Sequence, residues 1–166
     1  MTRRTRYFGK FRGKVFNSVD PLNLGRVQAI VPDVTGSNPT GWAMPCFPVA
    51  GMFMAPAVGA NVWVEFEKGD LERPIWTGCF YADEAEVPVL DAPLPGGSVI
   101  TMETAGQNRI AISDLPGANG GVILRSASGA TVIVNDTGIY ITNGKGASLT
   151  LTGPTVTIND GALSVT

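Results

Sequence analysis

Residues 129–166 read GATVIVNDTGIYITNGKGASLTLTGPTVTINDGALSVT. Pairs of apolar residues two positions apart recur along this stretch, at Val132/Val134, Ile139/Ile141, Leu149/Leu151, Val156/Ile158 and Leu163/Val165. Alternation with a period of two predicts β-strands that bury one face. The pairs begin at intervals of seven, ten, seven and seven residues. Each unit is therefore a short strand followed by a turn that Gly, Asn or Asp can form.

Strands this short cannot bury a core alone, so they need neighbours that repeat the pattern. Two architectures satisfy this need: a compact β-meander, or a stack along an axis as a β-helix, with or without sister chains. Tyr140 is the only aromatic residue after Tyr81, whereas a β-sandwich core normally holds several. A thin prism filled by Val, Ile and Leu needs none. We therefore expect a stacked β-structure that is intertwined in an oligomer.

Composition places the whole chain in the all-β class. Its 166 residues provide room for one large or two small domains, and its 21 Gly and 12 Pro favour turns over helices. The net charge of −2 favours no particular class of partner. The N-terminus is basic without a following apolar segment, so neither a secretory signal nor a membrane span is expected.

A second pattern occupies residues 8–81, where all three Trp lie. Five short strands in this region predict a small closed or half-closed barrel with a conventional core. The strands are expected at Gly9–Asn17, Gly25–Val31, Gly41–Phe47, Asn61–Glu67 and Pro74–Tyr81.

Residues 82–97 are rich in acidic residues, Pro and Gly, and Pro88, Pro93 and Pro95 disfavour ladder hydrogen bonds there. We expect four parts: a basic N-terminal arm at 1–7, the barrel at 8–81, a linker at 82–97 and the repeat region at 98–166.

Catalytic chemistry is not indicated. The chain has no His, which excludes Ser-His-Asp, Cys-His and His-metal sites within one chain. Glu65 and Glu67 could imitate a glycosidase pair, but the solvated face of a strand is the simpler interpretation. Cys46 and Cys79 are expected to be buried free thiols. We expect no enzyme activity, no catalytic residues, no metal and no cofactor.

The barrel region resembles the OB-fold domain of the phage baseplate assembly protein V and VgrG-type spike family, and the repeat region resembles the C-terminal spike of that family. The most specific match is Gly69-Asp70 followed by Arg73-Pro74, after the strand Val62-x-Val64-x-Phe66. The residues that we take as structural markers of the family are Gly25, Trp42, Pro56, Gly59, Gly69, Asp70, Arg73 and Pro74.

The resemblance implies a homotrimer, with three OB domains around the base and three chains wound into a triangular β-helical needle. Such a spike joins the baseplate hub of a contractile injection machine to its tip, and it pierces the target envelope when the sheath contracts. It would assemble in the cytoplasm and then form part of a phage tail or injection particle, meeting the target membrane only on injection. The chain lacks the hub-like domain of many VgrG proteins, so a separate hub protein is expected.

The partner surfaces can be assigned as expectations. Hub contacts are expected through the basic arm and an apolar loop, at Arg3, Arg4, Arg6, Met52 and Phe53. The repeat runs to the last residue, where exposed strands would need a cover. A PAAR-type tip protein is therefore expected to contact Leu163, Ser164, Val165 and Thr166. The alternative function is a single-stranded nucleic-acid-binding or adaptor protein, although the barrel carries few cations and no nucleic acid is expected.

Overall fold

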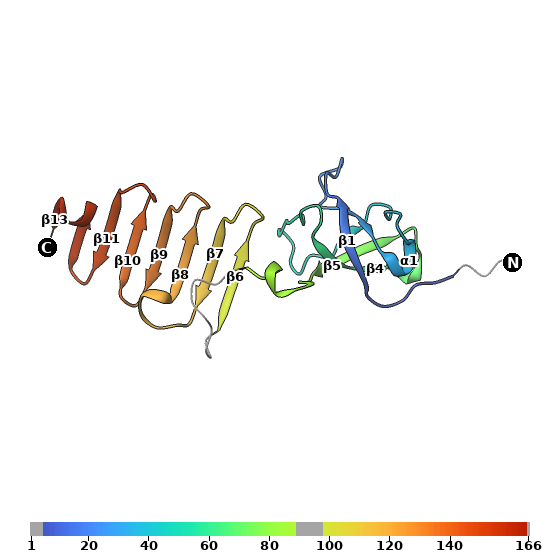
Figure 1. Ribbon diagram of the computed structural model, residues 1–166. Helices are drawn as coiled ribbons and strands as arrows, with labels where there is room; N and C mark the ends of the chain where they lie inside the picture. The colour runs from blue at the N-terminus through green and yellow to red at the C-terminus, as the bar shows by residue number, and fades with distance from the viewer. Residues whose placement is uncertain (1–4, 89–97, 166) are drawn as a thin grey trace. The chain divides into compact units, whose positions relative to one another are not determined.

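The computed structural model describes residues 5–88 and 98–165, which belong to two compact units, Met1–Val87 and Pro88–Thr166. Each unit is built on one β-sheet (Figure 1). We describe each unit by itself.

The first unit is a five-stranded sheet whose two edges meet. The strand order is β2-β1-β4-β5-β3, and the pairs are antiparallel except for β3 with β5. A bridge between Val27, just before β2, and Ala43, just before β3, joins the two edge strands and closes the sheet into the expected barrel. The elements are β1 (Phe11–Asn17), β2 (Gln28–Ile30), α1 (Pro32–Thr35), β3 (Met44–Pro45), β4 (Asn61–Phe66), η1 (Glu67–Gly69), β5 (Pro74–Cys79) and η2 (Glu84–Glu86).

Alternation along β4 explains the barrel core. Val62, Val64 and Phe66 point inward and are at most 5% exposed, whereas Trp63 and Glu65 between them are half-buried. Burial of each such aliphatic side chain contributes about 1.5–3 kcal/mol. The core also holds one large aromatic residue, Trp76, whose indole N–H donates to the Gly25 carbonyl at 3.0 Å. The remaining core residues are Val15, Val27, Ala29, Val31 and Ala43.

The second unit is an eight-stranded antiparallel sheet in which each strand pairs with its neighbour in the chain. This meander is the first of the two architectures left open by the sequence, and the described residues of one chain show no β-helical winding. The strands are β6 (Val99–Glu103), β7 (Arg109–Ser113), β8 (Gly121–Arg125), β9 (Thr131–Asn135), β10 (Gly138–Thr142), β11 (Ser148–Thr152), β12 (Thr155–Ile158) and β13 (Leu163–Val165), with η3 (Gly117–Asn119) and η4 (Asn159–Gly161) in two of the connections.

The strand registers align the apolar residues in two rows on one face of this sheet, because directly opposed residues point to the same side. We call it the aliphatic face. One row contains Ile100, Ile112, Val122, Val134, Ile139, Leu151 and Val156. The other contains Met102, Ile110, Leu124, Val132, Ile141, Leu149, Ile158 and Leu163.

The aliphatic face has no cover within the described part of the chain. Ile100 is 63% exposed, Met102 60% and Leu163 54%. Ala111, on the opposite face, is the one buried hydrophobic residue that this unit contributes among the described residues. An apolar face of this length on a single chain marks an interaction surface. Within residues 5–88 and 98–165, no helix has the length and hydropathy needed to cross a bilayer.

Candidate interaction surfaces

The N-terminal arm reaches the barrel at the turn after β4, and we call this place the arm end. The Tyr7 backbone N–H donates to the Gly69 carbonyl at 3.0 Å, and the Arg6 guanidinium donates to the Lys68 carbonyl at 2.6 Å. Gly69 has φ +74°, and a Cβ there would lie 3.0 Å from atoms of both Arg6 and Phe8. The position therefore requires glycine, both for its left-handed backbone and for the close approach of the arm. Phe8 itself is 70% exposed.

The residues Asp70, Arg73 and Pro74 build the turn that carries this end. The Asp70 carboxylate accepts the Glu72 backbone N–H at 3.1 Å, and the Arg73 N–H donates to the Asp70 carbonyl at 2.9 Å. The Arg73 side chain lies 3.4 Å from a Glu67 carboxylate oxygen, and Pro74 then starts β5 opposite Phe66. These contacts explain the family motif by local turn chemistry.

The loop between β1 and β2 is organised by one buried carboxylate, that of Asp20. Its oxygens accept the backbone N–H groups of Leu22 and Leu24 at 3.0 and 2.8 Å, and the Arg26 guanidinium at 2.6 and 3.0 Å. These hydrogen bonds, with Arg26 as the largest cause, hold the pKa of Asp20 well below its ordinary value. Arg26 also lies over the ring of the family marker Trp42, 5.4 Å from its centroid, so the loop is held rigid.

Exposed apolar residues gather beside this loop, and we call them the exit patch. Phe53 stacks near Phe47 with ring centroids 6.3 Å apart, and both rings lie against Gly25, next to Leu24. Phe53 is nevertheless 65% exposed. Of the family markers nearby, Pro56 is buried, and Gly59 has φ +89° and donates its N–H to Val15. The patch consists of Leu24, Val49, Met52, Phe53 and Met54, each at least 40% exposed.

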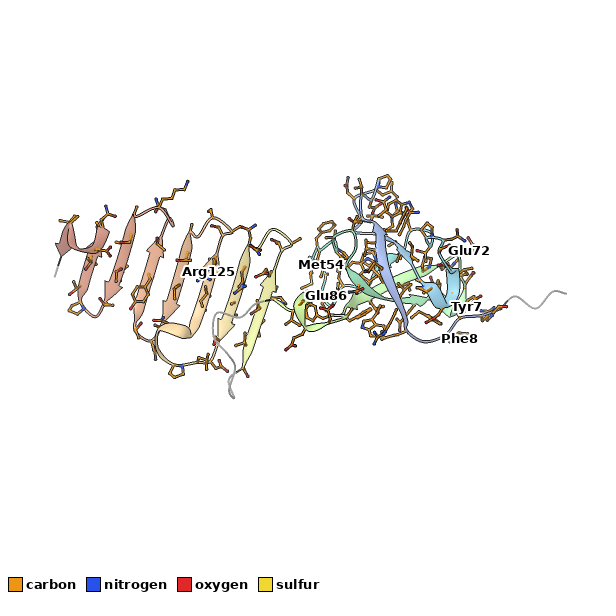
Figure 2. The ribbon with its side chains drawn as sticks, in the orientation of Figure 1. Tyr7, Phe8, Met54, Glu72, Glu86 and Arg125 are labelled. Atoms are coloured by element: carbon orange, nitrogen blue, oxygen red, sulfur yellow. The ribbon has the colours of Figure 1, made fainter. Side chains whose placement is uncertain are left out.

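The exit patch lies at the opposite end of the barrel from the arm. Figure 2 shows Tyr7, Phe8 and Glu72 at one end and Met54 with Glu86 at the other. Glu86 belongs to the segment by which the chain leaves the barrel, and its carboxylate accepts from Asn61 Nδ2 and the Ala82 N–H, each at 2.7 Å.

The structure thus separates the expected hub contacts. Arg6 lies at the arm end, whereas Met52 and Phe53 lie at the exit end, so they do not form one local surface of a single chain. Arg3 and Arg4 fall outside the described residues.

The expected tip contacts belong to the last strand of the meander. Leu163 and Ser164 are in β13, opposite Ile158 and Thr157, and Val165 is opposite Val156. β13 is an edge strand of the sheet, which leaves one side open for another chain. Thr166 lies outside the described residues.

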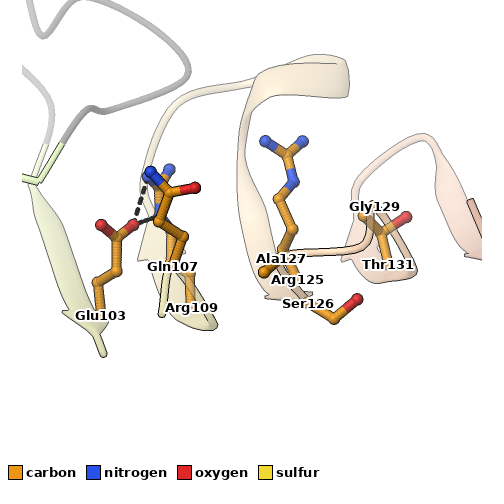
Figure 3. A pocket seen from close by; sticks show the side chains of 8 residues that line it. All are labelled: Glu103, Gln107, Arg109, Arg125, Ser126, Ala127, Gly129 and Thr131. Atoms are coloured by element: carbon orange, nitrogen blue, oxygen red, sulfur yellow. Dashed lines mark hydrogen bonds and ion pairs between the residues drawn. The ribbon is translucent and has the colours of Figure 1, made fainter. Parts of the chain in front are cut away.

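A pocket of about 370 Å³ lies at the turns between β6 and β7 and between β8 and β9 (Figure 3). Its one carboxylate, that of Glu103, accepts from Arg109 Nε and Nη2, both at 2.6 Å, and Arg109 in turn lies opposite Arg125. The Ser126 hydroxyl accepts the Ala130 N–H and lies 2.9 Å from that of Ser128. The Glu103 carboxylate is therefore engaged in an ion pair within the sheet.

A wider groove of about 650 Å³ over β1 bears on the nucleic-acid alternative, because Arg12, Lys14, Phe16 and Phe80 line it. Phe80 stacks on Trp63 at 4.7 Å, and the Arg12 guanidinium lies over both rings, 4.9 and 5.5 Å from their centroids. Bases stack on free aromatic faces; Trp63 and Phe80 are engaged with each other and with Arg12, whereas Phe16 is 53% exposed.

The two thiols correct a prediction from sequence. Cys46 and Cys79 are free, as expected, but both are exposed rather than buried. Cys46 follows the edge strand β3 and Cys79 ends β5, so neither lies in the middle of a core strand. Burial still raises the pKa of the Cys79 thiol.

Two family models match the chain in the same order as the two units. Residues 11–81 match the type VI secretion system and phage-baseplate injector OB domain, and residues 99–164 match the phage baseplate V C-terminal trimerisation domain. The chain belongs to the phage baseplate V and VgrG-type family. A search of curated proteins found no significant match. As a baseplate V protein, the chain belongs to a family of structural baseplate proteins and carries an OB domain followed by a trimerisation domain.

Proposed function

We propose that this baseplate V protein is the homotrimeric central spike of a contractile injection machine, joining the baseplate hub to a membrane-piercing tip. The observation that carries the proposal is the aliphatic face of the second unit, which coincides with the match to a trimerisation domain. Three such sheets with their aliphatic faces inward would form a triangular needle, which supplies the cover that a single chain lacks.

Burial explains why the needle would need more than one chain, and the match to a trimerisation domain favours three. A single-layer sheet has one aliphatic face and no second layer to bury it. At about 25 cal/mol per Å² of apolar surface removed from water, two continuous rows of Ile, Leu and Val provide a large driving force for association. The middle row of the opposite face is mixed in polarity, with Thr101, Ala111, Ile123, Ile133, Tyr140, Thr150 and Thr157, whereas both rows of the aliphatic face are apolar throughout.

The proposal places the hub at the arm end of the barrel and the tip at β13. We assign the hub to the arm end, where Arg6 and the exposed Phe8 lie against Gly69. We assign a PAAR-type tip protein to β13, whose open edge lies at the end of the meander. Met52 and Phe53, at the other end of the barrel, leave the hub surface in this proposal. Puncture of the target envelope is then the mechanical task of a rigid body, with no catalytic group, metal or nucleic acid involved.

The experiment that tests the proposal is the solution mass of the purified chain, measured by light scattering before and after brief heating in SDS. A resistant species of three times 17.4 kDa is expected. A monomer would overturn the spike and favour an adaptor function. Pull-downs with hub and tip proteins then test the two ends separately.

A further inference from the structure

The exit patch has the composition of a protein interface. Aromatic residues and Met are enriched in the cores of interfaces, and charged residues are depleted there. Phe53 is 65% exposed, Met52 40% and Met54 44%, and residues 47–59 contain no charged residue. The adjoining loop is held in place by Asp20 and Arg26, which satisfy each other's charge. The patch is therefore an uncharged and apolar surface beside a loop that these contacts hold in place.

We propose that the exit patch packs against its own copies in the two other chains of the trimer. This inference rests on the trimer of the proposed function. Residues 88–98 separate the barrel from the trimerisation domain, and eleven residues span at most about 40 Å. Three barrels are therefore tethered close together at the end from which the chain leaves, where Met54 and Glu86 lie.

Symmetry favours this occupant over a different partner. Residues that lie on a threefold axis meet their own copies, and a charged residue there would face two like charges. The arm end is the opposite case, because Arg6, Lys68 and Glu72 lie there, and it fits a partner with its own charges. The absence of charge in residues 47–59 fits a position on this axis.

Methionine oxidation tests the inference in the purified full chain without a hub. Peroxide oxidises exposed thioethers faster than buried ones. Met44 on β3 is 47% exposed in the single chain and serves as the reference. Met52 and Met54 are expected to oxidise several-fold more slowly than Met44, with each rate measured against that of the unfolded chain.

Met102 separates the two ways in which this experiment can fail. It lies on the aliphatic face and is 60% exposed in the single chain, so the needle trimer should protect it. Rapid oxidation of Met102 would overturn the trimer and the inference together. Protection of Met102 with rapid oxidation of Met52 and Met54 would overturn the inference alone.

Cross-linking identifies what covers the patch. In a Cys46→Ser/Cys79→Ser background, M52C is expected to give covalent dimers of the chain with a short bismaleimide. F8C, an exposed position at the arm end, is the matched control and should remain monomeric on a denaturing gel. Because the trimer is expected to resist SDS, the samples are unfolded completely in guanidinium before the gel is run. Protection of Met52 without cross-linking of M52C would show that something other than a second copy covers the patch, and would overturn the inference.

Discussion

Asp20 and Arg26 form a two-pronged contact within the β1–β2 loop, with Arg26 Nε and Nη2 donating to the same carboxylate oxygen at 3.0 and 2.6 Å. The Asp20 side chain is 4% exposed and that of Arg26 16%. Because the carboxylate also accepts the Leu22 and Leu24 N–H groups, one side chain fixes both the loop and the guanidinium that lies over Trp42.

Acid should therefore destabilise the barrel through Asp20. The folded-state pKa of Asp20 lies below its ordinary value of 3.8, so the ionised carboxylate stabilises the folded state above about pH 4, and this stabilisation is lost as the pH falls below that value. Asp20→Asn is expected to unfold more easily than the native chain at pH 7, and the difference should shrink below pH 4. Tryptophan fluorescence measures it, because all three Trp lie in the barrel. A difference that is independent of pH would contradict this assignment.

The first residue of β8 in the second unit, Gly121, must be glycine. Gly121 has φ +88°, and a Cβ there would overlap the Val134 carbonyl oxygen of the neighbouring strand. Gly121→Ala is expected to cost at least about 1–2 kcal/mol from the backbone conformation alone, with the overlap in addition. It should lower the temperature at which the trimer resists SDS. Gly106→Ala is the control, because its Cβ would meet nothing closer than 3.6 Å; equal effects of the two substitutions would contradict the argument.

The strands of both units could be predicted because alternation gives their position and the face that each residue occupies. Val132 and Val134, read as one pair, indeed lie on the aliphatic face with Ile139 and Ile141 opposite them. Short turns leave little choice of register, which accounts for the two continuous rows.

The surfaces were harder to predict, because they depend on which loops meet in space. No periodicity indicates that Asp20 binds the N–H groups of its own loop, although Asp20-Pro21 does mark a turn. From sequence, both the basic Arg6 and the apolar Met52 are expected to contact the hub. The two ends of a barrel can be distinguished only once the strand directions are known. The exposure of Cys79 could not be predicted for a related reason. Apolar neighbours in the sequence favour burial, but they do not show at which residue a strand leaves the core.

Hub binding should distinguish the two ends of the barrel. Phe8→Asp places a charge on the exposed side chain at the arm end and is expected to weaken capture of the hub protein, because an apolar contact becomes a desolvated charge that costs several kcal/mol. Phe53→Asp, at the exit end, should leave hub capture unchanged in any trimer that forms. Pull-down with the hub protein at matched trimer concentrations measures both variants. Loss of binding by Phe53→Asp alone would move the hub to the exit patch.

Two adjacent residues of β11 provide the sharpest test of the needle. Leu151 pairs with Ile139 and Val156 on the aliphatic face, whereas Thr150 pairs with Tyr140 and Thr157 on the opposite face. Leu151→Asp would bury a carboxylate in each of the three chains, at an effective cost of several kcal/mol per ion. Its solution mass should fall from the trimer to the monomer.

Thr150→Asp introduces the same charge one residue away on the same strand, and both positions are half-buried in the single chain. If the aliphatic faces are turned inward, Thr150 faces water, and its variant should remain trimeric with a change in stability of about 1 kcal/mol or less. Light scattering of the two variants side by side gives the answer. A trimeric Leu151→Asp together with a monomeric Thr150→Asp would mean that the opposite face of the sheet is the one that lies inside the needle.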